Sequence, residues 1–109
     1  MATEQSTVDD LLDRLAGAGR VTARKMFGEY CVYLSDKPVA LVCDGRLYVK
    51  PTAAGRELVP DAAVEPPYRG AKPHLMLPPD QWEDRDSLCR LVRATFEALP
   101  RPKRRKRRA

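Results

Sequence analysis

A change in the spacing of apolar residues after Thr22 constrains the fold more than any other feature of this chain. Residues 22–27 and 29–34 alternate in type at every second position. Side chains of an extended strand point to opposite faces in turn, so this spacing predicts two β-strands. Gly28, between the two segments, permits a bulge or a close backbone approach.

The segments that follow predict a continuation of the same sheet. A turn is expected at residues 35–38, and Val39–Cys43 has apolar residues on both faces, which is typical of a central strand. Asp44-Gly45 is a strong hairpin signal that leads into Arg46–Lys50. Residues 24–50 are therefore expected to form an antiparallel meander of three strands, with its third strand in the centre of the sheet.

Helical periodicity is confined to the two ends of the chain. Ser6, supported by Asp9, is expected to cap a first helix, and Gly17 and Gly19 to end it. An apolar stripe at i, i+3, i+4 and i+7 follows the cap, and it consists of Val8, Leu11, Leu12 and Leu15. A second stripe, closed by Pro100, predicts a C-terminal helix that Asp80 and Glu83 would cap, and it consists of Leu88, Leu91, Val92, Thr95, Phe96 and Leu99.

The middle of the chain is rich in proline. Pro51 is suited to the first turn of a short helix that would extend to about Leu58. Further prolines mark a loop-rich stretch, within which short strands are expected near Tyr68 and at His74–Leu77. The order of elements predicted for the whole chain is α-β-β-β-α-β-β-α, a two-layer α+β fold with helices against an antiparallel sheet.

The length of 109 residues and the 43% hydrophobic content fit one domain, expected at residues 1–100. No apolar run is long enough to cross a membrane, and the N-terminus is polar and acidic, so we expect a cytoplasmic protein without a membrane partner. Three cysteines in unrelated contexts, Cys31, Cys43 and Cys89, are expected to be reduced thiols in the core.

The net charge of +5 divides unevenly along the chain. Residues 1–100 hold 13 Lys or Arg against 15 Asp or Glu, a charge of −2, whereas residues 101–109 carry +7. Like charges with nothing apolar to bury predict a disordered tail. The cations that could bind nucleic acid or an acidic partner are Arg101, Lys103, Arg104, Arg105, Lys106, Arg107 and Arg108. The alternative is a solubilising terminus without a dedicated partner.

Two groups of residues have a functional and a structural interpretation. Met26 and Phe27 could form an exposed contact surface, although apolar strand residues are more often core, which we favour. A basic face with tyrosines, as in single-strand nucleic-acid binders, could arise from Tyr30, Tyr33, Tyr48, Lys25, Arg46 and Lys50. We favour tyrosines packed under the helices, because Glu29, Asp36 and Asp44 would repel phosphate.

No pattern of catalytic or metal-binding residues is found in the sequence. Cys31 and Cys43 would face each other if the intervening loop had three residues, but reduced thiols are commoner in the cytosol than a disulfide. His74 is the only histidine, and there is no Cys-x-x-Cys, so neither a zinc site nor any other metal or cofactor is expected. General acid–base chemistry needs paired groups, and none can be named, so we expect a protein that is not an enzyme.

A run of residues resembles the N-terminal domain of the TfoX/Sxy family. Arg24-Lys25 precedes the run Met26, Phe27, Gly28 and Tyr30, with Ala40-Leu41-Val42 and then Leu47, Tyr48, Val49 and Lys50 further on. Met76-Leu77-Pro78 also fits, and the similarity extends over about residues 8–99. These motif residues are expected to be mostly structural. One difference is Glu29, where competence regulators usually have a second glycine.

The resemblance implies a secretion-chaperone-like α+β fold and a bacterial regulatory role. The resemblance implies that full-length members regulate natural competence together with the cyclic-AMP receptor protein. Those members carry a second, helical domain, which this chain is expected to lack. The resemblance therefore suggests a protein-interaction module linked to transcription or competence, acting as a monomer or a weak homodimer. The alternative is an accessory nucleic-acid binder that acts through Arg101–Arg108.

Overall fold

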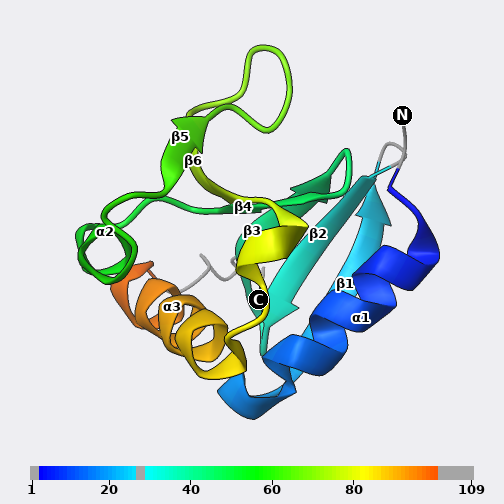
Figure 1. Cartoon of the computed structure of the whole chain (residues 1–109), viewed down its shortest axis with the longest axis horizontal. Coiled ribbons are helices and arrows are strands. Elements are labelled where there is room, and N and C mark those ends of the chain that lie inside the picture. The colour runs from blue at the N-terminus through cyan, green and yellow to red at the C-terminus, as the bar shows by residue number, and fades with distance from the viewer. Residues whose placement is uncertain (1–2, 27–28, 101–109) are drawn as a thin grey trace, which may run out of the picture.

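Helices cover one face of a six-stranded antiparallel sheet in the computed structural model of the chain, which describes residues 3–26 and 29–100 (Figure 1). The helices are α1 (Gln5–Leu15), α2 (Ala53–Leu58) and α3 (Arg85–Ala98), with 3-10 turns η1 (Ala16–Ala18) and η2 (Pro79–Gln81). The strands are β1 (Val21–Met26), β2 (Glu29–Leu34), β3 (Lys37–Cys43), β4 (Arg46–Val49), β5 (Ala63–Glu65) and β6 (His74–Leu77). The α+β class and the two layers are confirmed.

The strands lie in the order β1-β2-β3-β4-β6-β5, so β3 is central, as predicted. Four strands precede α2, because the Asp44-Gly45 turn separates β3 from β4. Asp44 and Gly45 have φ angles of 54° and 74°, the left-handed conformation that a two-residue hairpin turn needs at both positions. A second two-residue turn, at Ser35 and Asp36, joins β2 to β3 and is shorter than the predicted turn at residues 35–38.

The core lies between the sheet and the apolar stripes of α1 and α3. Val8, Leu11 and Leu15 of the first predicted stripe are fully buried, whereas Leu12 is only partly buried. Of the second stripe, Phe96 and Leu99 are partly buried and the other four residues are buried, namely Leu88, Leu91, Val92 and Thr95. Each large aliphatic side chain removed from water contributes about 1.5–3 kcal/mol. Among the described residues, no helix is long and apolar enough to cross a bilayer.

Two links outside the stripes close this core. Trp82 is buried and donates its indole N–H to the carbonyl oxygen of Leu77, 3.0 Å away. Lys37, the first residue of β3, donates from Nζ to the carbonyl oxygens of Phe96 and Leu99 at the end of α3. The ammonium also lies over the Phe96 ring, 4.3 Å from its centre. A cation is favourable at this position, because the last carbonyl groups of a helix carry partial negative charge.

The helix starts differ from those predicted. Glu4, not Ser6, occupies the N-cap of α1, and no side chain bonds to the free N–H groups there. Thr52 caps α2 by accepting from the Gly55 N–H, so Pro51 lies outside the helix. Asp84, not Asp80, caps α3, because Pro79–Gln81 form a separate 3-10 turn before it. At the starts of α1 and α3, more than one polar residue is suited to the N-cap, so the sequence alone does not distinguish between them.

The loop-rich middle of the chain was predicted in part. β6 has the predicted bounds, His74–Leu77. The other short strand is wrong in position, since β5 covers Ala63–Glu65 and Tyr68 lies in the loop that joins β5 to β6. This loop stands out at the top of Figure 1. Pairing of Val64 with Leu75 fixes β5 in place, and this contact is not visible in the local sequence pattern.

Candidate functional site

The two faces of the sheet differ in what covers them. Cross-strand pairs on the helix-covered face include Val32 with Ala40 and Val42 with Leu47. Pairs on the opposite face, which we call the open face, include Cys31 with Leu41 and Leu41 with Tyr48. Because successive residues of a strand point to opposite sides, the same strands that build the core also display a second set of side chains. The candidate site lies on this open face.

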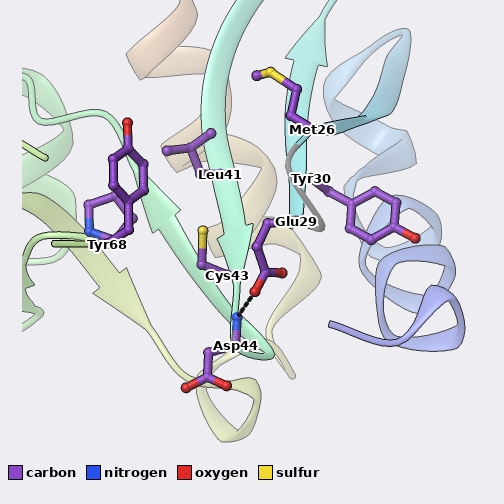
Figure 2. A pocket seen from close by; sticks show the side chains of 8 residues that line it. Met26, Glu29, Tyr30, Leu41, Cys43, Asp44 and Tyr68 are labelled. Carbon is purple, nitrogen blue, oxygen red and sulfur yellow. Dashed lines mark hydrogen bonds between the residues drawn. The ribbon is translucent and has the colours of Figure 1, made fainter. Parts of the chain in front are cut away.

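A groove of about 560 Å³ runs across one end of the open face. Its volume falls in the range of about 300–1,000 Å³ that is usual for ligand clefts. Figure 2 shows Tyr68 on one side and Met26 on the other, with Leu41 and Cys43 between them. The lining consists of Met26, Glu29, Tyr30, Leu41, Cys43, Asp44, Pro67 and Tyr68. The groove therefore combines the ends of β1, β2 and β3 with the loop before β6.

Met26 and Tyr68 are unusually exposed for their type. Met26 is 40% exposed and Tyr68 is 61% exposed, although most large apolar side chains of the protein are buried. The prediction that Met26 belongs to the core is therefore wrong. Met26 is the last residue of the edge strand β1, and it pairs with Glu29 on the open face.

Glu29 ties the N-terminal segment to the β3–β4 hairpin. Its Oε1 accepts from the Thr3 N–H at 3.1 Å and from the Thr3 hydroxyl at 2.6 Å. Its Oε2 accepts from the Asp44 N–H at 3.0 Å, the bond that is drawn as a dashed line in Figure 2. Thr3 Oγ1 in turn accepts from the Gly45 N–H. Glu29 is thus a structural anchor at the rim of the groove.

The cysteines are not positioned for a disulfide. The partner of Cys31 on β3 is Leu41, because the turn has two residues and the register shifts between Val32 and Tyr33. Cys43 is therefore a diagonal neighbour of Cys31, at a Cα separation of about 7–8 Å for this geometry. That is at or beyond the upper limit for a disulfide without backbone movement. All three cysteines are free thiols.

Both cysteines of the open face have thiols that resist ionisation. Burial raises the pKa of Cys43 to about 11, with smaller contributions from the carboxylates of Glu29 and Asp44. Burial also raises the pKa of Cys31, although Tyr33, Lys50 and Arg24 act in the opposite direction. The thiolate is the reactive form of cysteine, so neither residue is suited to nucleophilic chemistry near neutral pH.

The tyrosines divide between the two faces. Tyr30 packs under α1 and donates its hydroxyl to Gln5 Oε1 at 2.9 Å, as the favoured interpretation required. Tyr33 and Tyr48 instead pair with residues of the open face, so that interpretation is wrong for them. Arg24 lies over the Tyr33 ring, 5.7 Å from its centre, and the neighbouring Tyr48 raises the pKa of Arg46.

Leu47, Lys50 and His74, which the sequence analysis also names, do not line the groove. Leu47 is fully buried in the core, Lys50 is half-buried, and His74 bonds through Nδ1 to the carbonyl oxygen of Lys72 at 2.8 Å. Residues 3–26 and 29–100 contain no group of three or more His, Cys, Asp or Glu side chains that could hold a metal ion. Phe27, Gly28 and the cations of residues 101–108 lie outside the described residues.

The groove as a unit was missed at the sequence level. Met26, Glu29, Leu41 and Asp44 belong to the predicted meander, but Pro67 and Tyr68 come from a loop more than 20 residues further along the chain. The sequence signal for this side of the groove is Tyr68 after two prolines. This pattern predicts a short strand there and not one wall of a groove.

The chain is similar to a known protein family and to a protein from another organism. The family model of the TfoX N-terminal domain matches residues 13–99. A protein of Spirochaeta aurantia, described as "Uncharacterized 12.7 kDa protein in trpE 5'region", is 40% identical over 106 residues, which cover 97% of this chain and 91% of that protein. Both matches extend over nearly the whole folded part, including β1–β4 and the groove residues that they carry.

Proposed function

This chain belongs to the TfoX N-terminal domain family, and from that premise we propose that it is a regulatory module that binds a partner protein through the groove on the open face. The observation that carries the proposal is the exposure of Met26 and Tyr68 beside a groove with an apolar floor. Exposed apolar side chains gathered at one place are typical of interaction sites, and methionine adapts well to different partner shapes.

The groups in the groove favour binding over catalysis. Both oxygens of Glu29 accept hydrogen bonds from Thr3 and Asp44, and the Cys43 thiol stays protonated near neutral pH. A general base needs a free lone pair directed at the substrate, and a nucleophile needs an adjacent base. A non-enzymatic role in transcription or competence regulation is the form of this proposal that the family suggests.

The proposal is tested by affinity capture from native bacterial lysate with the full chain and two variants. Met26→Glu places a charge at the groove, and Leu58→Glu is the matched control, because Leu58 is also 40% exposed but lies on α2. We expect a partner that the wild-type chain and Leu58→Glu retain and Met26→Glu loses. Its purified form should then bind the three chains in the same order by surface plasmon resonance. A partner retained equally by both variants contradicts the proposal.

A second candidate function rests on the uneven charge of the chain. Residues 101–109 carry +7 and the rest of the chain −2, so an accessory nucleic-acid binder would act through its tail. Cations that neutralise phosphates release counterions, and seven such contacts give a log–log slope of affinity against salt of about −6 on duplex DNA. Fluorescence anisotropy of labelled DNA with the full chain and a chain that ends at Pro100 tests this, and equal affinities would reject it.

A further inference from the structure

We infer that the partner supplies an extended segment of alternating apolar and acidic residues, which adds to the sheet as a strand beside β1. This inference rests on the proposed function, because β1 ends at Met26 on the rim of the groove, and a segment paired with β1 is led to the groove at that end. It adds the conformation and the chemistry of the segment that is bound.

The outer side of β1 has backbone groups that another strand can use. β1 and β5 are the two edges of the sheet, and β1 has six residues where β5 has three (Figure 1). The Ser35 N–H donates to the carbonyl oxygen of Arg20 at 2.8 Å. Because bonded and non-bonded pairs alternate along an antiparallel ladder, the N–H and C=O groups of Val21, Ala23 and Lys25 point away from β2. Among the described strands, β1 pairs only with β2, so these groups are suited to the addition of a strand.

The helix-covered side of this edge favours apolar residues in the added strand. Val21 and Ala23 pair with Leu34 and Val32, which places their side chains on the helix-covered face. Both are only partly buried against the core, as is Leu12 of α1, the helix that packs against β1. Alternate side chains of a strand beside β1 would lie over this margin of the core and bury it further.

The charged residues of β1 favour acidic residues at the intervening positions. Arg24 and Lys25 are exposed, and they are the charged side chains of the strand. Arg24 lies on the open face against the Tyr33 ring, a contact that leaves the charge of the guanidinium in place. Neither cation forms an ion pair with any residue in the ranges 3–26 and 29–100. An acidic side chain opposite Arg24 would therefore meet an unneutralised charge.

The carboxylates on the two elements packed against β1 have other partners. On β2, Glu29 accepts from Thr3 and from the Asp44 N–H. On α1, the partners are Gln5 for Asp9, Arg14 for Asp10 and Arg85 for Asp13. The edge therefore stays positive, which disfavours pairing with the same edge of a second copy and favours an acidic segment. A polypeptide, unlike a nucleic acid, can also satisfy the backbone groups of β1.

Selection from a displayed library of random 12-residue peptides tests the inference, with the full chain as the target. A variant with Arg104→Gln and Lys106→Gln identifies peptides that bind the basic tail, and only peptides that bind this variant and wild type equally are kept. We expect the kept peptides to alternate apolar and acidic residues over at least five positions. They should bind the matched variant Arg24→Gln with Lys25→Gln about three- to tenfold more weakly, as for two exposed ion pairs.

Strand addition itself is tested by amide hydrogen exchange with one kept peptide at saturation. Exchange at Val21, Ala23 and Lys25 should slow at least tenfold, because their N–H groups gain acceptors. Exchange at Thr22 and Arg24, which face β2, should change much less. Methylation of alternate peptide nitrogens should lower the affinity at least tenfold in one register and less than twofold in the other, since only one set of N–H groups faces β1.

The possible outcomes separate this inference from the proposed function. Kept peptides without the alternating pattern, or unchanged exchange at Ala23, would overturn the inference. A lysate partner that Met26→Glu loses and that Arg24→Gln with Lys25→Gln retains in full would also overturn it, and would leave the groove as the binding site. Peptides that protect β1, together with a lysate partner that Met26→Glu retains, would support strand addition and contradict the proposed role of the groove.

Discussion

The helix-covered face and the open face of the sheet are made by the same strands, yet the burial of their side chains differs. On the helix-covered face, Val32, Val42 and Leu47 are fully buried under α1 and α3. On the open face, Leu41 is half-buried and Met26 is exposed, with the loop around Tyr68 on the far side of the groove. Burial on this face is uneven, since Cys31, Cys43 and Tyr48 are buried. The difference indicates that stability is concentrated on one face, which leaves the other free to carry a binding site.

The largest effect that would test this contrast comes from shortening one leucine on each face. Leu47→Ala is expected to lower the free energy of unfolding by about 2–5 kcal/mol, because it leaves a cavity in the core. Leu41→Ala should cost about 1 kcal/mol, since the half-buried side chain borders an open groove. Urea denaturation followed by circular dichroism measures both values. Equal losses would show that the open face contributes as much to stability as the core does.

The same pair of variants should act in the opposite order on binding. Leu41→Ala is expected to lower the affinity of the groove for its ligand more than Leu47→Ala does, when both affinities are measured at a temperature where both variants are folded.

A smaller effect is expected from the anchor at the rim of the groove. Glu29→Ala removes the acceptor for three hydrogen bonds, from Thr3 and Asp44, and should lower the free energy of unfolding by about 1–3 kcal/mol. Amide hydrogen exchange at Asp44 and Gly45 should become faster, while exchange within α3 should change only as much as global stability does.

Thr3→Val supplies the control for the Glu29 prediction, since it removes only the hydroxyl of the network. If Glu29 acts through Thr3, the two substitutions together should cost less than the sum of their separate effects. Strictly additive losses would mean that the two residues stabilise the chain independently.

The smallest expected effect concerns the thiols of the open face in alkaline solution. The pKa of Cys43 is about 11 in the folded chain against an ordinary value of 9.0, so the folded state holds the proton more tightly. The stabilisation that results is complete below about pH 9 and is lost as the pH rises toward about 11. One pKa unit corresponds to about 1.4 kcal/mol, and we expect a loss of roughly 1–2 kcal/mol.

Cys43→Ala isolates this contribution from the tyrosines and lysines that titrate in the same range. Thermal unfolding of wild type and variant between pH 8 and 10.5 should show a stability difference that narrows as the pH rises. A stability difference that does not change with pH would mean that the Cys43 thiol has the same pKa in the folded and the unfolded chain.

Much of the fold was predictable because its signals are local. Leu11 and Leu15 follow the helical period of α1, and Asp44-Gly45 determines a hairpin by its own backbone preferences. The α+β class follows from such segments, and the family match to residues 13–99 agrees with it.

The groove was not predictable, because it depends on contacts that are distant in sequence. Tyr68 reaches the site only because β5 pairs with β6 and leaves the loop between them beside the ends of β2 and β3. The pairing of Cys31 with Leu41 depends on a register shift between Val32 and Tyr33, and Val39 and Ala40 beside the shift are both buried in the core. Periodicity alone cannot show such a shift, since one extra residue reverses the side to which every later side chain points.

The hydrogen bonds from Lys37 hold the end of α3 beside the first residue of β3. Lys37 begins β3 and Cys43 ends it, and six steps of about 3.4 Å separate them by about 20 Å. Residues 101–109 follow soon after Leu99, whose carbonyl oxygen Lys37 holds. β3 therefore separates the end of α3 from the groove by about 20 Å, so a partner that contacts both Leu99 and Cys43 must span that distance.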